Sequence, residues 1–374
     1  MKLFKLIFTI IIVLIIIPLA YLAYKTKLSS KNSKITHITS NNVSEKDKEL
    51  LETANAIFAP LPDIALNKDN PITEEKVQLG KTLFFETRMS KGNTISCNSC
   101  HNLANYGVDN LPTSQGYKGT FGVRNSPSVF NAALHNTQFW DGRAKDVEEQ
   151  VKGPIFNPIE MAMPNENIVL DIIKSIPQYQ EMFKKAFPND ENPISLSNIQ
   201  LAIGAFERKL LLTPSKFDEF LKGNVNTFNQ QEKIGLELFI NKGCISCHQG
   251  LTIGGQQFQK FGLINYPYWK YTKSKLHDKG VFEITKNKDD EYYFKVPSLR
   301  NVERTYPYFH DGSVWKLKDA IKIMGKTQLD IDLSDQEIQD IESFLNTLTG
   351  DISDKVRTMP QLPKSTDTTP IPVN

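Results

Sequence analysis

Cysteine, net charge and strand patterns are all scarce in this sequence. Only four of its 374 residues are cysteine, and 44 basic against 42 acidic side chains leave a formal net charge of +2. That balance, without a basic stripe along the chain, argues against nucleic acid as a partner. Alternation of apolar and polar residues suggests one short hairpin at most, near residues 281–296, so the predicted fold class is mainly α.

The four cysteines fall into two identical motifs, each ending in histidine. The C-x-x-C-H motifs consist of Cys97, Cys100, His101, Cys244, Cys247 and His248. This is the attachment signature of c-type haem, in which two thiols form thioethers and the histidine binds the iron. A lone motif could equally be a zinc-type knuckle or a chance pair. Because no cysteine remains for disulfides, and a four-thiolate zinc site would not need the histidines, the sequence predicts two covalent haem c groups.

The N-terminus has the composition of a membrane segment. An apolar run over positions 6–23 follows Lys2 and Lys5 and has Thr9 as its only clearly polar side chain. Its length lies between a signal-peptide core and a spanning helix of about 20 residues. Since no small-x-small cleavage site follows, we favour an uncleaved inner-membrane anchor over a cleaved signal. Attachment of c-type haem then places the folded part in the periplasm.

Helical periodicity is clear in three places. Apolar residues spaced three or four apart predict a helix through Gly80, which we expect to pack closely against another helix. Two more helices are predicted at residues 196–212 and 335–348. The latter begins with a capping box formed by Ser334 and Glu337.

The two halves of the chain repeat one another. The matched segments are 80–84 with 235–239, 127–131 with 297–301, and 139–142 with 309–312. The last two pairs are displaced along the chain by the same amount, a register that random loops would not keep. We therefore predict two cytochrome-c-like haem domains related by internal duplication.

Three residues outside the haem motifs could carry chemistry. Met324 is either an iron ligand that raises the potential of the second haem or a flexible core residue. Glu160 lies in a Pro-bounded, mostly apolar loop. It is either a buried structural carboxylate or a group that moves a proton between the oxygens of a bound peroxide. Trp140 is either core or a stepping stone between the haems.

Longer motifs resemble one family. They are the runs 124–127, 138–146 and 152–155, the pair Glu160-Met161, and the run 308–312 with Met324. Over about residues 50–370 the chain is similar to the bacterial di-haem cytochrome c peroxidases. The resemblance implies a peroxidatic haem held by His101 with Glu160 as acid–base catalyst. It implies an electron-donating haem held by His248 and Met324, with Trp140 between the haems.

The resemblance also implies further ligands and partners. A Ca²⁺ ion is expected at the domain interface, bound by oxygens of Asn125, Thr305 and Pro307. Hydrogen peroxide would be the substrate, and a small cytochrome c or cupredoxin the electron donor. A homodimer is kept as a candidate assembly.

The expected domain order follows from the two haem motifs. It runs from the membrane segment (1–24) and a flexible tether (25–45) to an N-terminal peroxidatic domain (46–212), a C-terminal electron-transfer domain (213–350) and a tail (351–374).

One position departs from the family pattern. Many members carry a histidine that closes the peroxidatic iron in the resting enzyme, where this chain has Tyr117. A neutral phenol is a weak iron ligand, so we expect the first iron to be open without reductive activation. Two alternatives would close it: Tyr117 as a tyrosinate, if a nearby arginine or burial lowers its pKa, or His135 as the ligand.

Two other functions stay open. One is a di-haem enzyme of the methylamine-dehydrogenase-maturation type, which oxidises side chains of a partner protein. That group has a tyrosine where Met324 stands. The other is a non-catalytic electron carrier or sensor, for which Glu160 would be superfluous.

Overall fold

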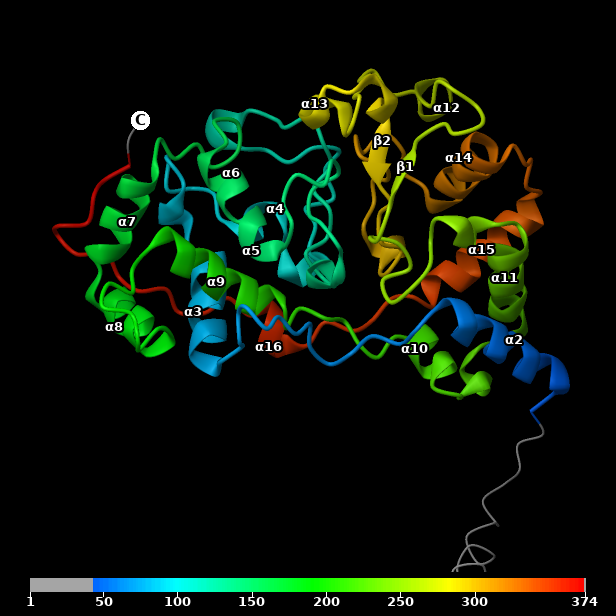
Figure 1. Cartoon of the computed structure of the whole chain (residues 1–374), viewed down its shortest axis with the longest axis horizontal. Coiled ribbons are helices and arrows are strands. Elements are labelled where there is room, and N and C mark those ends of the chain that lie inside the picture. Colours follow the sequence, from blue (N-terminus) through cyan, green and yellow to red (C-terminus); the bar gives the residue numbers. More distant parts are fainter. Residues whose placement is uncertain (1–42, 373–374) are drawn as a thin grey trace, which may run out of the picture. The chain divides into compact units, whose positions relative to one another are not determined.

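The computed structural model describes residues 43–372, and the chain divides into two compact units, 1–48 and 49–374. The predicted membrane segment and most of the tether therefore lie outside the described residues. Among residues 43–372, no helix is both long and apolar enough to cross a membrane. The unit that begins at Glu49 holds both haem motifs (Figure 1).

Helices dominate the structure, which confirms the mainly α prediction. Up to Glu207 they are α2 (Glu45–Ile57), α3 (Glu74–Phe84), α4 (Cys97–Cys100), α5 (Val147–Gln150), α6 (Lys152–Phe156), α7 (Glu166–Lys174), α8 (Pro177–Ala186) and α9 (Leu196–Glu207). Beyond it they are α10 (Lys216–Leu221), α11 (Gln230–Asn241), α12 (Trp269–Thr272), α13 (Phe282–Thr285), α14 (Leu317–Leu329), α15 (Asp335–Asn346) and α16 (Asp354–Arg357). In the described part of the chain the strands are β1 (Phe258–Lys260) and β2 (Tyr293–Lys295), which pair antiparallel.

Each half is built on two helices that touch at a glycine. A Cβ added to Gly80 in α3 would lie 1.9 Å from the Ala202 carbonyl oxygen in α9. One added to Gly235 in α11 would lie 1.9 Å from the Asp340 carbonyl oxygen in α15. The close packing predicted for Gly80 is therefore confirmed, and it occurs a second time at the matching position of the other half.

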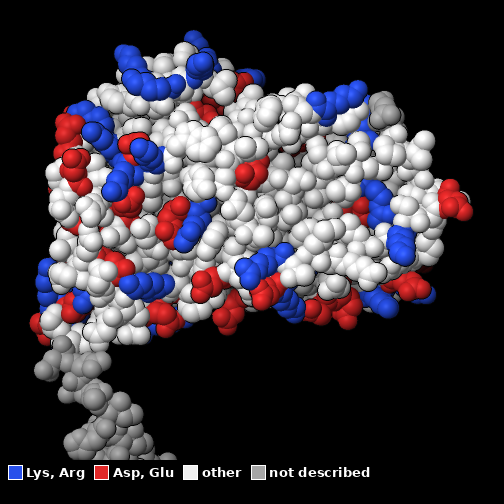
Figure 2. All heavy atoms as spheres, turned by 180° about the vertical axis from the view of Figure 1, so that it is seen from behind, with Lys and Arg blue, Asp and Glu red and all other residues white. Residues whose placement is uncertain are grey.

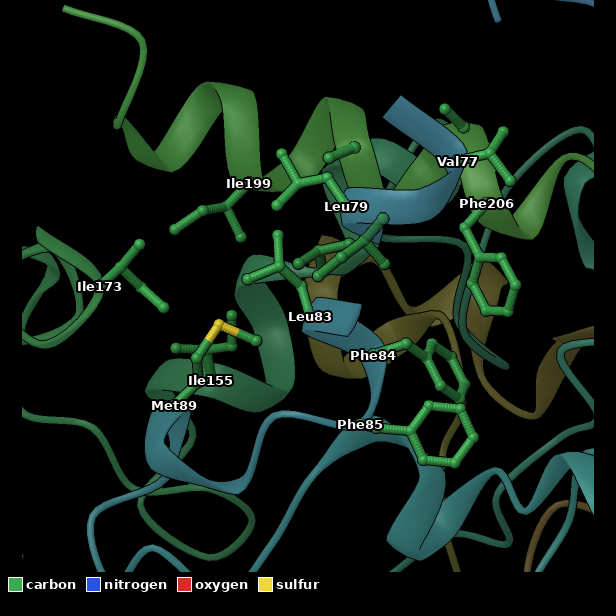
Figure 3. Close-up of a cluster of buried hydrophobic side chains, with 14 of the residues drawn as sticks. Val77, Leu79, Leu83, Phe84, Phe85, Met89, Ile155, Ile173, Ile199 and Phe206 are labelled. Atoms are coloured by element: carbon green, nitrogen blue, oxygen red, sulfur yellow. The ribbon is translucent and has the colours of Figure 1, made fainter. Parts of the chain in front are cut away.

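The core of the first half forms around α3. Leu79 and Leu83 of α3 are fully buried and lie with Ile199 of α9 and Ile155 of α6 in one apolar cluster (Figure 3). Thr73 caps the α3 N-terminus by accepting a hydrogen bond from the Lys76 amide. The cluster fixes the helices from which the haem-binding loops depart.

The duplication is visible in the backbone as well as in the sequence. Asn131 and Asn301 both have a positive φ, near 63° and 62°. The side-chain oxygen of Asn131 accepts from the Leu212 amide, and that of Asn301 accepts from the Gly350 amide. In each half, therefore, an asparagine side chain joins its loop to the backbone just beyond the equivalent helix, which is α9 in the first half and α15 in the second.

The two halves meet through a pair of equivalent hydrogen bonds. The Asn125 amide donates to the His310 carbonyl (2.7 Å), and the Lys295 amide donates to the Trp140 carbonyl (2.8 Å). In the register of the repeat, Lys295 is the counterpart of Asn125, and His310 is the counterpart of Trp140. Each half therefore donates one of these hydrogen bonds and accepts the equivalent one from the other half, so the contact has an approximate two-fold character.

The predicted hairpin near residues 281–296 is wrong. Residues 282–285 form α13, and β2 pairs instead with β1, which precedes both α12 and α13 in the chain. The displacement between matching segments is larger after this region than at the haem motifs, so the second half contains an insertion here. The insertion carries α12 and α13 and lengthens the connection that a hairpin would have closed tightly.

The helix predicted at 196–212 is shorter than expected. It ends at Glu207, because the following backbone turns away to bond with Asn131: the Asn131 amide donates to the Leu210 carbonyl. The helix predicted at 335–348 is α15, with the expected capping box at Ser334 and Glu337. α15 ends at Asn346, two residues before the predicted boundary.

Each end of the described chain packs on the opposite half. The Gly250 amide of the second half donates to the carbonyl of Ile57, the last residue of α2. The tail returns to the first half, where Arg88 donates to the Pro363 carbonyl (2.8 Å) and Leu362 packs on the core around α3. Figure 1 shows this tail running back past α16 toward α7 and α8. Figure 2 shows acidic and basic side chains interspersed along the left and lower edges of one face, with few of them in its middle.

Candidate haem sites and the contact between them

The second haem motif opens onto an apolar cavity of about 250 Å³. His248, Cys244 and Cys247 line it, and Met324 of α14 lines it as well. Burial lowers the pKa of His248 to about 4, so its imidazole is neutral, the form that binds iron. All four cysteines of the chain are free thiols. The residues present therefore fit a covalently bound haem with a histidine and a methionine on the iron.

The first haem motif forms α4, whose backbone bonds hold the two cysteines one turn apart. The amide of His101 donates to the Cys97 carbonyl, and Cys97 packs against the core around α3. The Nδ1 of His101 is buried and makes no hydrogen bond of good geometry, although the backbone of Pro127 and Gly107 lies close enough to act on the imidazole. Burial also lowers the pKa of His101. A neutral imidazole beside two thiols fits the first haem.

Glu160 lies in a rigid loop near this first motif. Its Oε1 accepts a hydrogen bond from Asn157 Nδ2 (2.8 Å), and its carbonyl accepts from the Tyr117 amide (2.8 Å). Burial raises the pKa of Glu160, while the charge of Arg143 and the Asn157 bond oppose the rise. The negative charge of Glu160 in turn helps to raise the pKa of Cys100. Glu160 is thus a half-buried, oriented carboxylate within electrostatic reach of the first haem motif.

The structure separates the two candidates for closing the first iron. Tyr117 packs on the Glu160 loop: a Cβ on its neighbour Gly116 would lie 1.9 Å from the Ile159 carbonyl oxygen. The hydroxyl of Tyr117 is buried without a partner. His135, in contrast, lines the cavity of the second haem, close to Gly255. That the first iron is open in the oxidised protein stays a prediction.

Trp140 lies at the contact between the halves. Its Nε1 donates to the Asn125 carbonyl (2.9 Å), and its ring meets that of His310 edge to face at 6.3 Å. Trp140 also lines the cavity that contains Met324. It is therefore packed against the second site from a loop of the first half, as a residue between two haems must be.

The three residues expected to bind Ca²⁺ border one cavity. Asn125 of the first half and Thr305 and Pro307 of the second half all line the same cavity. The Nδ2 of Asn125 donates to the Leu111 and Pro112 carbonyls, which directs Oδ1 the other way. The contact between the halves thus gathers neutral oxygen donors, the type that Ca²⁺ prefers.

Sequence reasoning missed a buried charge network beside Trp140. Arg124 donates to Asp278 (2.6 Å) and pairs with Asp141, which also binds Arg143 (2.8 Å). Asp141 lies in the repeated turn and could have been singled out for that reason. The Lys-rich sequence around Asp278 contains no pattern that predicts an ion pair with Arg124. This network ties the inserted segment of the second half to the Trp140 loop.

Two C-x-x-C-H motifs, one in each half and each with its own histidine, define a two-haem c-type cytochrome. The model of the family described as di-haem cytochrome c peroxidase matches residues 74–226, and that described as cytochrome c matches residues 233–349. The cytochrome c551 peroxidase of Pseudomonas aeruginosa is 45% identical over 324 residues, covering 86% of this chain and 92% of that protein. The chain belongs to the di-haem cytochrome c peroxidase family, and its two motifs carry haem c.

More distant relatives share the fold. The methylamine utilization protein MauG of Methylorubrum extorquens is 32% identical over 341 residues, covering 86% of this chain and 90% of that protein. A crystal structure described as a MauG-like protein associated with microbial copper homeostasis has a TM-score of 0.70 and 30% identity. It covers 80% of this chain and 97% of that one.

Proposed function

We propose that this protein reduces hydrogen peroxide to water at its first haem and draws the electrons from a small redox protein through its second. One observation carries the proposal: the two copies differ at the iron-facing position. Met324 lines the second cavity with His248, whereas its counterpart in the register of the repeat is Pro154, which has no ligand atom. The first copy instead places Glu160 near its haem motif.

Glu160 is the proton carrier of the reaction. When bound, haem supplies the iron that binds peroxide and exchanges electrons, chemistry that side chains lack. Glu160 accepts a proton from one peroxide oxygen and returns it to the other. Its burial raises its pKa, which brings its basicity closer to the value that suits a proton carrier at neutral pH. Asn157 fixes the orientation of the carboxylate.

The second half supplies electrons. His248 and Met324 would hold its iron, and a thioether ligand would give it a raised potential, which suits electron transfer. Trp140 passes electrons toward the first haem. Each peroxide consumes two electrons and two protons and yields two water molecules, and a small cytochrome c or cupredoxin restores the electrons.

A calcium ion supports the contact between the halves. Asn125 comes from one half and Thr305 and Pro307 from the other, so an ion bound to all three would fasten the Trp140 loop to the second copy. The reaction takes place in the periplasm, with the 1–24 segment as an inner-membrane anchor. A homodimer remains a candidate assembly.

The experiment compares two glutamate substitutions. Glu160→Gln should lower peroxide turnover with reduced cytochrome c by roughly 10²-fold or more, the usual scale for losing a positioned proton carrier. Both haems should stay attached with unchanged spectra. The exposed Glu166 of α7 provides the control, and Glu166→Gln should keep full activity. A near wild-type rate in Glu160→Gln would make Glu160 a structural carboxylate.

A further inference from the structure

A buried lysine stands at the wall of the second haem cavity without a carboxylate partner. Lys295, the last residue of β2, is 6% exposed and lines the cavity with His248 and Met324. Its Nζ donates to the Thr137 carbonyl (2.8 Å). Within residues 43–372, no carboxylate lies at ion-pair distance from this ammonium. The negative charge that acts on it is that of Asp141, which is paired with Arg124 and Arg143.

Two residues of the first half that contact Lys295 each carry an unpaired polar group. The Nε2 of His135 and the Oγ1 of Thr137 are both buried without a hydrogen-bond partner. The Nδ1 of His135 lies 3.5 Å from Lys295 Nζ, and His135 also lines the cavity. If Nδ1 accepts from the ammonium, the ring carries its proton on Nε2, which then has a hydrogen to donate. The ammonium of Lys295 therefore has neutral acceptors but no carboxylate, and two donors on residues that contact it, His135 Nε2 and Thr137 Oγ1, have no acceptor.

Such an arrangement is costly unless an anion completes it. A buried polar group without a hydrogen-bond partner destabilises the fold, and a buried charge without a counter-ion does so more strongly. Burial lowers the pKa of Lys295 to about 8, so most molecules still carry the charge at pH 7. An anion with two acceptor oxygens would satisfy the ammonium and both neighbouring donors. A carboxylate is the group of this kind that the second haem itself contains, in its propionates.

We propose that Lys295, His135 and Thr137 bind a propionate carboxylate of the second haem. The inference rests on the haem assigned to this cavity in the proposed function. It also gives that haem a contact with the loop of the first half that carries Trp140, since Thr137 lies just before Trp140 in this loop and the Lys295 amide donates to the Trp140 carbonyl (2.8 Å). The lysine charge favours the reduced haem, which carries one more electron.

The test uses the full chain with both haems attached. Lys295→Met should shift the propionate-bending band of the second haem in resonance Raman spectra and lower that haem's reduction potential. Lys295→Arg keeps the charge and should restore both values. The exposed Lys270 of α12 is the control, and Lys270→Met should change neither. Unchanged band and potential in Lys295→Met, with two haems per chain, would overturn the proposal and leave an adventitious anion or water as the partner.

A second variant covers the case in which Lys295→Met does not fold. Thr137→Val removes one hydroxyl at nearly constant volume and should shift the same band by a smaller amount; an unchanged band would again count against the site. Neither readout depends on peroxide. Failure of the propionate site is therefore distinguishable from failure of the proposed function, which would appear as absent peroxide turnover in the unsubstituted protein.

Discussion

At the scale of single residues, the two copies of the repeat carry different side chains at a few equivalent positions, and these differences distinguish the two haem sites. Trp140 in one copy corresponds to His310 in the other, and Asn125 corresponds to Lys295. The backbone bonds at these positions are the same in both copies, but the side chains differ. The two copies therefore share a backbone arrangement but differ in the chemical groups that they present at these positions.

The role of Met324 is testable through the potential of the second haem. Met324→His should leave both haems attached and lower the potential of the second, because imidazole in place of a thioether favours the oxidised iron. Turnover with the small redox donor should fall in parallel. Met359 is exposed in the tail, so Met359→His is the control and should change nothing. A redox titration that gives equal potentials for Met324→His and the unsubstituted protein would remove Met324 from the iron.

The environment of Glu160 should appear in the pH profile of turnover. Glu160 must be ionised to accept a proton, so activity falls as the pH drops through its pKa. Burial raises that pKa, which places the acid limb above the usual glutamate range. Asn157→Ala removes a bond that stabilises the ionised form, so the limb should move to higher pH. The prediction fails if kcat/KM against pH is the same for Asn157→Ala and the unsubstituted protein.

At the scale of elements, the two helix crossings fix where the haem-binding loops begin. In both α3 with α9 and α11 with α15, a glycine lets one backbone touch the other. The same pair of helices therefore supports two sites with different functions.

Adding one methyl group at either crossing should separate the helices. Gly80→Ala and Gly235→Ala would each place a Cβ 1.9 Å from a backbone carbonyl oxygen of the facing helix. Overpacking of this kind costs about 1–3 kcal/mol, which outweighs the gain of about 1 kcal/mol in helix propensity. Both variants should melt at a lower temperature in a calorimetric scan. Gly122 has no neighbour within 4 Å of an added Cβ, so Gly122→Ala should melt like the unsubstituted protein.

At the scale of the whole molecule, the halves are joined by exchanged segments as well as by equivalent bonds. The end of α2 bonds to the second half and the C-terminal tail packs on the first. A change in one half can therefore reach the other without crossing a flexible linker.

Membrane attachment belongs to this scale too. The full-length chain should stay with membranes after a high-salt wash, since screening weakens charge contacts but not the burial of an apolar run. A chain that begins at Glu45 lacks the apolar run, so it should stay in the supernatant. It keeps α2, so it should remain folded and active. Recovery of a mature protein that begins just after Tyr24 would show instead that the segment is a cleaved signal.

The local features of the protein are predictable from its amino-acid sequence. The haem motifs and the capping box at Ser334 are signals among residues near one another, and the repeat is visible because each matched segment is itself a short run of sequence. Short-range chemistry leaves such signals in composition and spacing, and the structure agrees with them.

Features that depend on contacts between residues far apart in the chain could not be predicted from the sequence and became known from the folded structure. The pairing of β2 with β1, the end of α9 at Glu207 and the partnership of Arg124 with Asp278 have no local signal. The same holds for Lys295, which in the sequence is one lysine among many. Its burial beside His135 arises because the two halves pack face to face, and burial is what turns an ordinary surface charge into a group that needs an anion.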